Sequence, residues 1–222
     1  MGSLALRTAI GGALAVAALS AQAVTLNLTI GPNLTVTGAT PTLNNPAGIF
    51  QGTLNGNPFL TYCVELTQFV ASGNQNYSIV SGLSYFPNYN PQVAPATILD
   101  RLGKLFTALG GITMPGNATQ SAATQVAVWE SIYETGATLD AGSGTFALGT
   151  AASNANNPGV TTAANAILAS AAAVTTSLYS ISILKNDSLQ DFLLITRVPE
   201  PASLALVGLA LAGLGFMRRR QA

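Results

Sequence analysis

The two ends of the chain limit which residues have to fold as a globular domain. The N-terminus carries Arg7, an apolar run at 10–19 and an A-x-A cleavage site that ends at Ala23, a pattern typical of a removable secretory signal peptide. We therefore expect residues 1–23 to be a signal peptide and the mature chain to start at Val24. The alternative, an N-terminal core helix, fits this pattern less well.

The C-terminus carries a second apolar segment. Residues 202–217 hold no charged side chain, and Arg218, Arg219 and Arg220 follow at once. The run is slightly shorter than the roughly 20 residues that usually span a bilayer, but flanking side chains or a thinner bilayer can compensate. Arginines mark the cytoplasmic side, so we expect a membrane-anchor helix at 202–217 with the rest of the protein outside the cytoplasm.

The segment before this apolar run completes a recognisable signal. Pro199, Glu200 and Pro201, the apolar helix and the arginine cluster together resemble the PEP-CTERM sorting signal, here residues 198–222. The resemblance implies a Gram-negative bacterium, recognition by an exosortase and transient anchoring in the inner membrane. It also implies that the protein ends at the cell surface or in an extracellular biofilm matrix rich in polysaccharide.

The composition of residues 24–197 excludes several classes of function. This segment has four basic and seven acidic side chains, a net charge of −3 without a basic stripe, so no nucleic-acid partner is expected. The chain has no histidine, so the commonest general base and metal ligand is missing. Its single cysteine cannot form an internal disulfide. We expect no enzyme, no catalytic residue, no metal and no cofactor.

Hydrophobic periodicity predicts strands, then helices, then strands. Period-two alternation and β-prone residues predict strands at 24–36 (with a turn at 31–33), 49–54, 59–70, 74–80, 178–184 and 189–196. Period 3.6 predicts helices from Pro95 to Gly110-Gly111, from Thr119 to Gly136, and at 161–179. This order predicts an α+β fold, a β-sandwich or barrel with an inserted helical subdomain at 24–197.

Three short motifs stand out within this predicted domain. They are an aromatic-Cys-apolar motif at Tyr62-Cys63-Val64, TQVAVW at 124–129 and LQDFL at 189–193. In this order and spacing they resemble the thioester domain of bacterial surface adhesins, and the resemblance covers residues 59–195. The TQVAVW motif is the most specific of the three.

The resemblance implies an internal thioester. The thiol of Cys63 would attack the side-chain carboxamide of Gln190 and expel ammonia, leaving an acyl group open to attack by an amine. The protein would then bind an amine-bearing surface or matrix polymer or protein, once and without turnover. The supporting residues of the motifs are Tyr62, Thr124, Gln125 and Trp129. We assign Gln125 to structure, as the second choice of acyl donor, and Trp129 to covering the bond.

Other features of the sequence leave an alternative open. First and last strands of a sheet are often neighbours, which would bring Cys63 and Gln190 together. However, the family often carries Asp or Asn where Glu65 stands, and no stalk domain separates Arg197 from the sorting signal. A free cysteine is also a common buried residue. The alternative is a non-covalent structural protein of the extracellular polysaccharide matrix with an idle Cys63.

Overall fold

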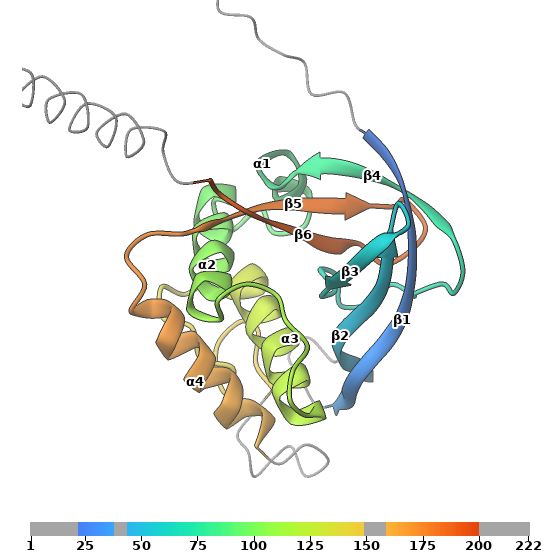
Figure 1. The fold of residues 1–222 in the computed structure, drawn as a ribbon. Coiled ribbons are helices and arrows are strands. Elements are labelled where there is room, and N and C mark those ends of the chain that lie inside the picture. The colour runs from blue at the N-terminus through green and yellow to red at the C-terminus, as the bar shows by residue number, and fades with distance from the viewer. Residues whose placement is uncertain (1–21, 38–43, 149–158, 200–222) are drawn as a thin grey trace, which may run out of the picture.

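Six antiparallel strands form one strongly curved sheet. The computed structural model describes residues 22–37, 44–148 and 159–199. The strands are β1 (Gln22–Thr37), β2 (Asn44–Leu54), β3 (Asn57–Thr61), β4 (Gln75–Ser81), β5 (Tyr179–Lys185) and β6 (Phe192–Arg197). Their order in the sheet is β3-β2-β1-β4-β5-β6, and the sheet curves until its two edges nearly meet (Figure 1). The α+β prediction is confirmed, with a barrel-like sheet rather than a sandwich.

A short seam joins the two edge strands β3 and β6. The Thr61 hydroxyl donates to the carbonyl of Leu193 at 2.7 Å. The Leu193 amide donates to the carbonyl of Tyr62 at 3.1 Å, and the Val64 amide donates to the carbonyl of Asp191 at 2.9 Å. Cys63 forms an isolated antiparallel bridge with Phe192. The seam therefore brings the segment around Cys63 to the segment around Gln190.

The predicted turn at 31–33 is wrong. Strand β1 continues through it, and its register with β2 shifts between Ile30 and Asn33. A β-bulge, with two residues opposite one, explains the shift. Gly31 is needed here because a Cβ atom at this position would lie 2.9 Å from the carbonyl oxygen of Ile49.

Helices fill the space beside the curved sheet. They are α1 (Gly82–Tyr85), the 3-10 helix η1 (Phe86–Asn88), α2 (Pro95–Ala108), α3 (Ala118–Tyr133) and α4 (Val160–Ala172). Helix α3 packs against β1, β2, α2 and α4, and Figure 1 shows α2, α3 and α4 grouped on one side of the sheet. The α2 prediction is confirmed at its start, whereas α1 and η1 were not predicted.

Helix α3 differs from its prediction in two ways. Its N-cap is Asn117, whose side-chain oxygen accepts from the Gln120 amide at 2.9 Å, and not Thr119. A 3.6-residue hydrophobic period is typical of a helix with one buried face, but every residue of 121–132 is buried. A helix with sheet on one side and helices on the other has no solvent face, and its many small residues allow close packing on all sides.

Three predicted segments end or begin elsewhere. Strand β3 stops at Thr61, so Cys63 lies just beyond it and 64–74 forms a loop. Helix α4 ends at Ala172 and not at 179, because the chain returns toward β5, and on the way the Leu178 amide donates to the Thr107 hydroxyl of α2 at 2.8 Å. Strand β6 starts at Phe192, so Gln190 precedes it.

The terminal predictions concern segments that the structure leaves undescribed. Residues 1–21 of the expected signal peptide and the expected anchor helix at 202–217 both lie outside the described residues. Within 22–37, 44–148 and 159–199, no helix is long and apolar enough to cross a membrane.

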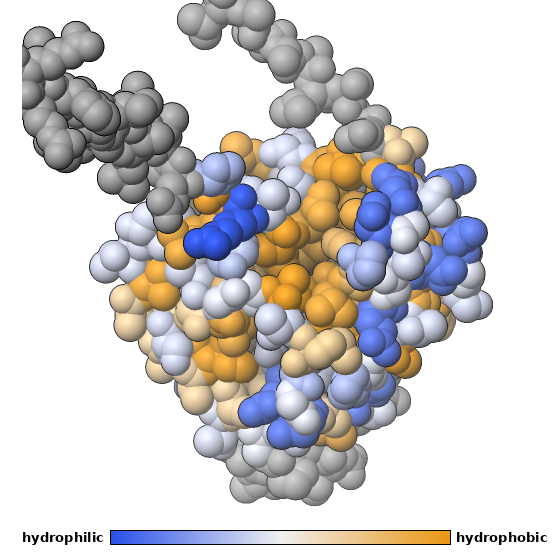
Figure 2. Space-filling view, viewed as in Figure 1, coloured by the Kyte–Doolittle hydropathy of each residue, from blue (hydrophilic) through white to orange (hydrophobic). Residues whose placement is uncertain are grey.

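Figure 2 shows apolar side chains gathered in a hollow between β3 and the β5–β6 pair, on the face where the seam closes.

Candidate functional site

Cys63 and Gln190 line the same cavity. This space, the cysteine cavity, has a volume of about 550 Å³. Its lining comes from the strands, the loop after β3, helix α3 and the segment before β6: Leu28, Thr29, Ile30, Pro46, Phe50, Cys63, Glu65, Gln68, Phe69, Val70, Ala71, Ser72, Trp129 and Gln190. Most of these side chains are apolar. The two residues of the expected thioester thus line one largely apolar space.

A side chain from helix α3 holds the backbone of Cys63. The Cys63 amide donates to Oε1 of Gln125 at 2.9 Å, and Nε2 of Gln125 donates to the Cys63 carbonyl at 2.9 Å. Gln125 thus pairs with Cys63 as a neighbouring strand would, at the point where β3 has ended. Both the oxygen and the nitrogen of its carboxamide are used in this pairing. Gln125 therefore has a structural contact with Cys63.

The backbone on both sides holds Gln190 in place. Its Nε2 donates to the carbonyl oxygens of Glu65 at 3.2 Å and Asp191 at 3.1 Å. Its amide donates to the carbonyl of Phe69 at 2.8 Å, and its own carbonyl accepts from the Tyr77 hydroxyl at 3.0 Å. Gln190 as a whole is 3% exposed, so its side-chain carboxamide is shielded from bulk water as well as fixed by these hydrogen bonds.

The remaining motif residues divide between two cavities. Trp129 lines the cysteine cavity, is 1% exposed, and its Nε1 has no hydrogen-bond partner among the described residues. Tyr62 and Thr124 instead line a second cavity of about 360 Å³ beside α2, α3 and α4. The alternation of an extended chain explains this division, because Tyr62 and Cys63 point to opposite sides.

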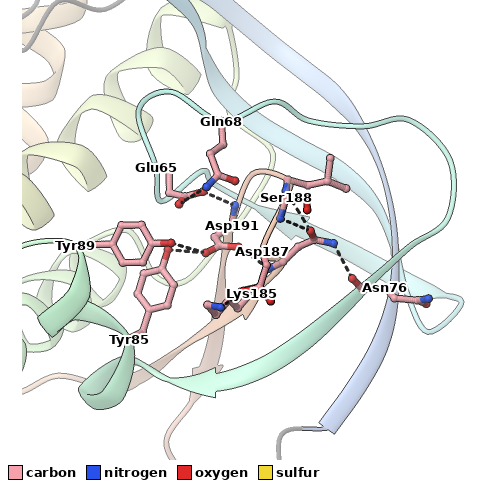
Figure 3. A network of polar contacts seen from close by, with 11 residues as sticks. Glu65, Gln68, Asn76, Tyr85, Tyr89, Lys185, Asp187, Ser188 and Asp191 are labelled. Carbon is pink, nitrogen blue, oxygen red and sulfur yellow. Dashed lines mark hydrogen bonds and ion pairs between the residues drawn. The ribbon is translucent and has the colours of Figure 1, made fainter.

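Glu65 belongs to a network of acidic and tyrosine side chains. Oε2 of Glu65 accepts from the Asp191 amide at 3.1 Å, and its Oε1 accepts from Nε2 of Gln68 at 2.9 Å. The Asp191 carboxylate accepts from the Tyr85 hydroxyl at 2.6 Å and from the Asn186 amide at 2.6 Å. Figure 3 shows the hydroxyls of Tyr85 and Tyr89 directed at this carboxylate.

Burial is the main cause of the raised pKa values in this region. Burial, and secondarily the charge of Glu65, raises the pKa of the Cys63 thiol far above its ordinary value. Burial and the charge of Asp191 raise the pKa of Glu65, and burial raises the pKa of Asp191. Cys63 is therefore a neutral thiol at neutral pH, and a thiolate would form there only with a proton acceptor close by.

Sequence reasoning missed part of this site. It treated Glu65 only as a departure from a family pattern, and it gave no role to Gln68, Asp191, Tyr85 or Tyr89. Glu65 lies two residues after Cys63, so strand alternation could have placed both side chains on one side. The tyrosines, four residues apart, carried no comparable signal. In the described part of the chain, no group of three His, Cys, Asp or Glu residues could hold a metal.

Comparison with known proteins supports the C-terminal prediction. A family model of the PEP-CTERM protein-sorting motif matches residues 197–220. No curated protein and no solved structure matches the chain. The sorting-signal prediction is therefore confirmed, and the motif indicates an extracellular protein that an exosortase sorts after anchoring in the membrane.

Proposed function

We propose that this extracellular protein forms a thioester between Cys63 and Gln190 and uses it to bind an amine-bearing partner covalently. The partner is a polymer or protein of the cell surface or biofilm matrix, where the protein acts in adhesion. Binding occurs once in each molecule, so the protein is not a turnover enzyme. The sorting motif at 197–220 supports the location, and the shared cysteine cavity carries the chemical part of the proposal.

The contacts of Gln190 favour it over Gln125 as the acyl donor. Both side chains lie near Cys63, but the Gln125 carboxamide is committed to the Cys63 backbone. Gln190 lines the cavity with Cys63, and its nitrogen donates to two backbone carbonyls. These acceptors fix the plane of the carboxamide. Such fixed geometry is what lowers the barrier of an intramolecular reaction.

The reaction has two balanced steps. In the first, a bond forms between the Cys63 sulfur and the Gln190 side-chain carbon, the carbon–nitrogen bond breaks, and the thiol proton leaves with the nitrogen as ammonia. In the second, a partner's primary amine attacks the same carbon, the carbon–sulfur bond breaks, an amide forms, and one proton of the amine goes to the Cys63 sulfur. The largely apolar cavity limits the competing attack by water.

Intact mass of the purified full chain tests this proposal. The wild type should be lighter than its sequence mass by one ammonia, whereas a Cys63→Ala control should match its own sequence mass. A small amine such as methylamine should add its full mass to the wild type only. A tandem spectrum of the peptide with residue 190 distinguishes a hydrolysed bond, which leaves glutamate, from unmodified Gln190, which would refute the thioester.

A non-covalent matrix protein is the second candidate. One observation favours it: Cys63 is only 5% exposed, and burial keeps its thiol neutral, as expected of a cysteine that serves as a core residue. In that case Cys63→Ala should leave matrix retention unchanged, and the mass of the wild type should equal its sequence mass. Retention that depends on Cys63 and resists denaturant would exclude this candidate.

A further inference from the structure

Formation of the proposed thioester needs a group that accepts the proton of the Cys63 thiol. The chain has no histidine, and the Cys63 thiol is buried with a raised pKa. A neutral thiol is a poor nucleophile, because the thiolate is the reactive form. Bulk water reaches a residue of 5% exposure poorly. The acceptor must therefore belong to the cavity itself.

Glu65 is the one such group in the cavity. Among the described residues that line it, only Glu65 has a carboxylate, and none has an amine, imidazole or guanidinium. Glu65 follows Cys63 by two residues, and both residues line this cavity. After burial, the charge of Glu65 is the second cause of the raised pKa of the Cys63 thiol.

The backbone of Glu65 contacts the other reactant. Its carbonyl oxygen accepts from Nε2 of Gln190 at 3.2 Å, so the nitrogen that has to leave lies beside the same residue. The carboxylate accepts from the Asp191 amide and from Nε2 of Gln68. Glu65 thus shares the cavity with the thiol and contacts the leaving group.

We propose that the Glu65 carboxylate accepts the Cys63 proton during thioester formation and returns it to the departing Gln190 nitrogen. This rests on the proposed thioester. The proton moves from sulfur to a Glu65 oxygen as the sulfur–carbon bond forms. It then moves to the nitrogen as the carbon–nitrogen bond breaks, so ammonia leaves and Glu65 is again a carboxylate. No other reactant is needed.

The surroundings of Glu65 predict how this step depends on pH. The titratable groups that act on Glu65 or respond to its charge come from β4, β5, α1 and α3 and from the segments after β3, after η1 and before β6. They are Cys63, Tyr77, Tyr85, Tyr89, Tyr133, Lys185 and Asp191. Burial, and after it the charge of Asp191, raises the pKa of Glu65, while the charge of Lys185 lowers it. Ammonia loss should therefore accelerate as pH rises through a midpoint above the ordinary range of glutamate.

The test follows ammonia loss in the full chain refolded from denaturant into detergent, by mass, at several pH values. Glu65→Gln keeps the shape and the acceptor for the Asp191 amide, and should slow the loss about 100-fold, the usual range for losing a general base. It should also abolish the pH dependence. Glu65→Asp should restore part of the rate. Circular dichroism and thermal unfolding establish that each variant folds.

Asp191→Asn provides a readout that a structural role would not move. The asparagine can still accept from the Asn186 amide and can donate to the Tyr85 hydroxyl, but it lacks the charge that raises the pKa of Glu65. The pH midpoint of ammonia loss should fall in this variant, even if Glu65→Gln does not fold.

The outcomes separate the two proposals. Equal rates and equal pH profiles for wild type and a folded Glu65→Gln would overturn the role of Glu65 and leave the thioester intact. An unshifted midpoint in Asp191→Asn would also overturn it. A wild type that never loses ammonia would refute the thioester itself, and the role of Glu65 with it.

Discussion

At the scale of single residues, Glu130 shows how burial sets a pH dependence. This residue of α3 is fully buried, its Oε1 accepts from the Asp140 amide at 2.7 Å, and its Oε2 has no partner among the described residues. Burial raises the pKa of Glu130 to about 8, from a reference value of 4.5 for the free side chain. Between about pH 4.5 and pH 8, Glu130 therefore keeps its proton in the folded protein and loses it in the unfolded chain.

The sign of the effect on stability follows from this difference. The contribution of protonated Glu130 to the free energy of unfolding is fully present below about pH 4.5 and is lost as pH rises to about 8. Over this range the free energy of unfolding falls by up to about 1.4 kcal/mol per pH unit. In Glu130→Gln this slope should disappear, and the variant should resist urea better than wild type at about pH 8. An exposed acid, Asp100→Asn, serves as the control. Parallel pH profiles for wild type and Glu130→Gln would contradict the prediction.

The sequence motifs point to three residues, Cys63, Gln190 and Trp129, that come from distant segments and line one cavity. Their roles in a thioester stay a prediction. The motif pattern does not reveal that Tyr62 faces a different cavity. It also does not reveal Glu65, the one charged side chain among the described residues that line the cavity.

At the scale of elements, the order and type were predictable but several ends were not. Helix α2 begins at Pro95 as the sequence indicates, because a proline in the first turn is a local signal. Strand β3 ends early, because the chain crosses from β2 to the seam with β6. The continuous β1 depends on the close approach of Gly31 to Ile49. Long-range pairing of this kind leaves no periodic signal in the sequence.

The contact between α3 and the end of β3 leads to a prediction at this scale. Gln125→Ala removes the partners of two buried backbone groups of Cys63, and each such loss costs about 1–3 kcal/mol. The variant should unfold at a clearly lower temperature than wild type. Gln120→Ala on the same helix is the matched control, because that side chain is exposed and, among the described residues, accepts from the Gly116 amide alone. Equal losses in both variants would show that the Gln125 contact does not hold Cys63.

At the scale of the whole molecule, the proposed bond lies where the sheet closes. Cys63 and Phe192 bridge the two edge strands, and Gln190 lies beside them, so a covalent link would tie together segments from both ends of the domain. Such a link restricts the unfolded chain, and in the loop-entropy account a loop of about 100 residues is worth about 5 kcal/mol. The thioester should therefore stabilise the fold as well as bind a partner.

Opening the bond with methylamine tests this stabilisation without a mutation. The treatment leaves a free Cys63 thiol and a methylated carboxamide at 190, and every other side chain stays unchanged. The treated wild type should unfold at a lower urea concentration than the untreated protein, because the long loop is no longer closed. Treated and untreated Cys63→Ala should coincide. If the wild type coincides as well while its mass shows the added amine, the seam is held by its hydrogen bonds and apolar contacts alone, and the thioester serves only to capture a partner.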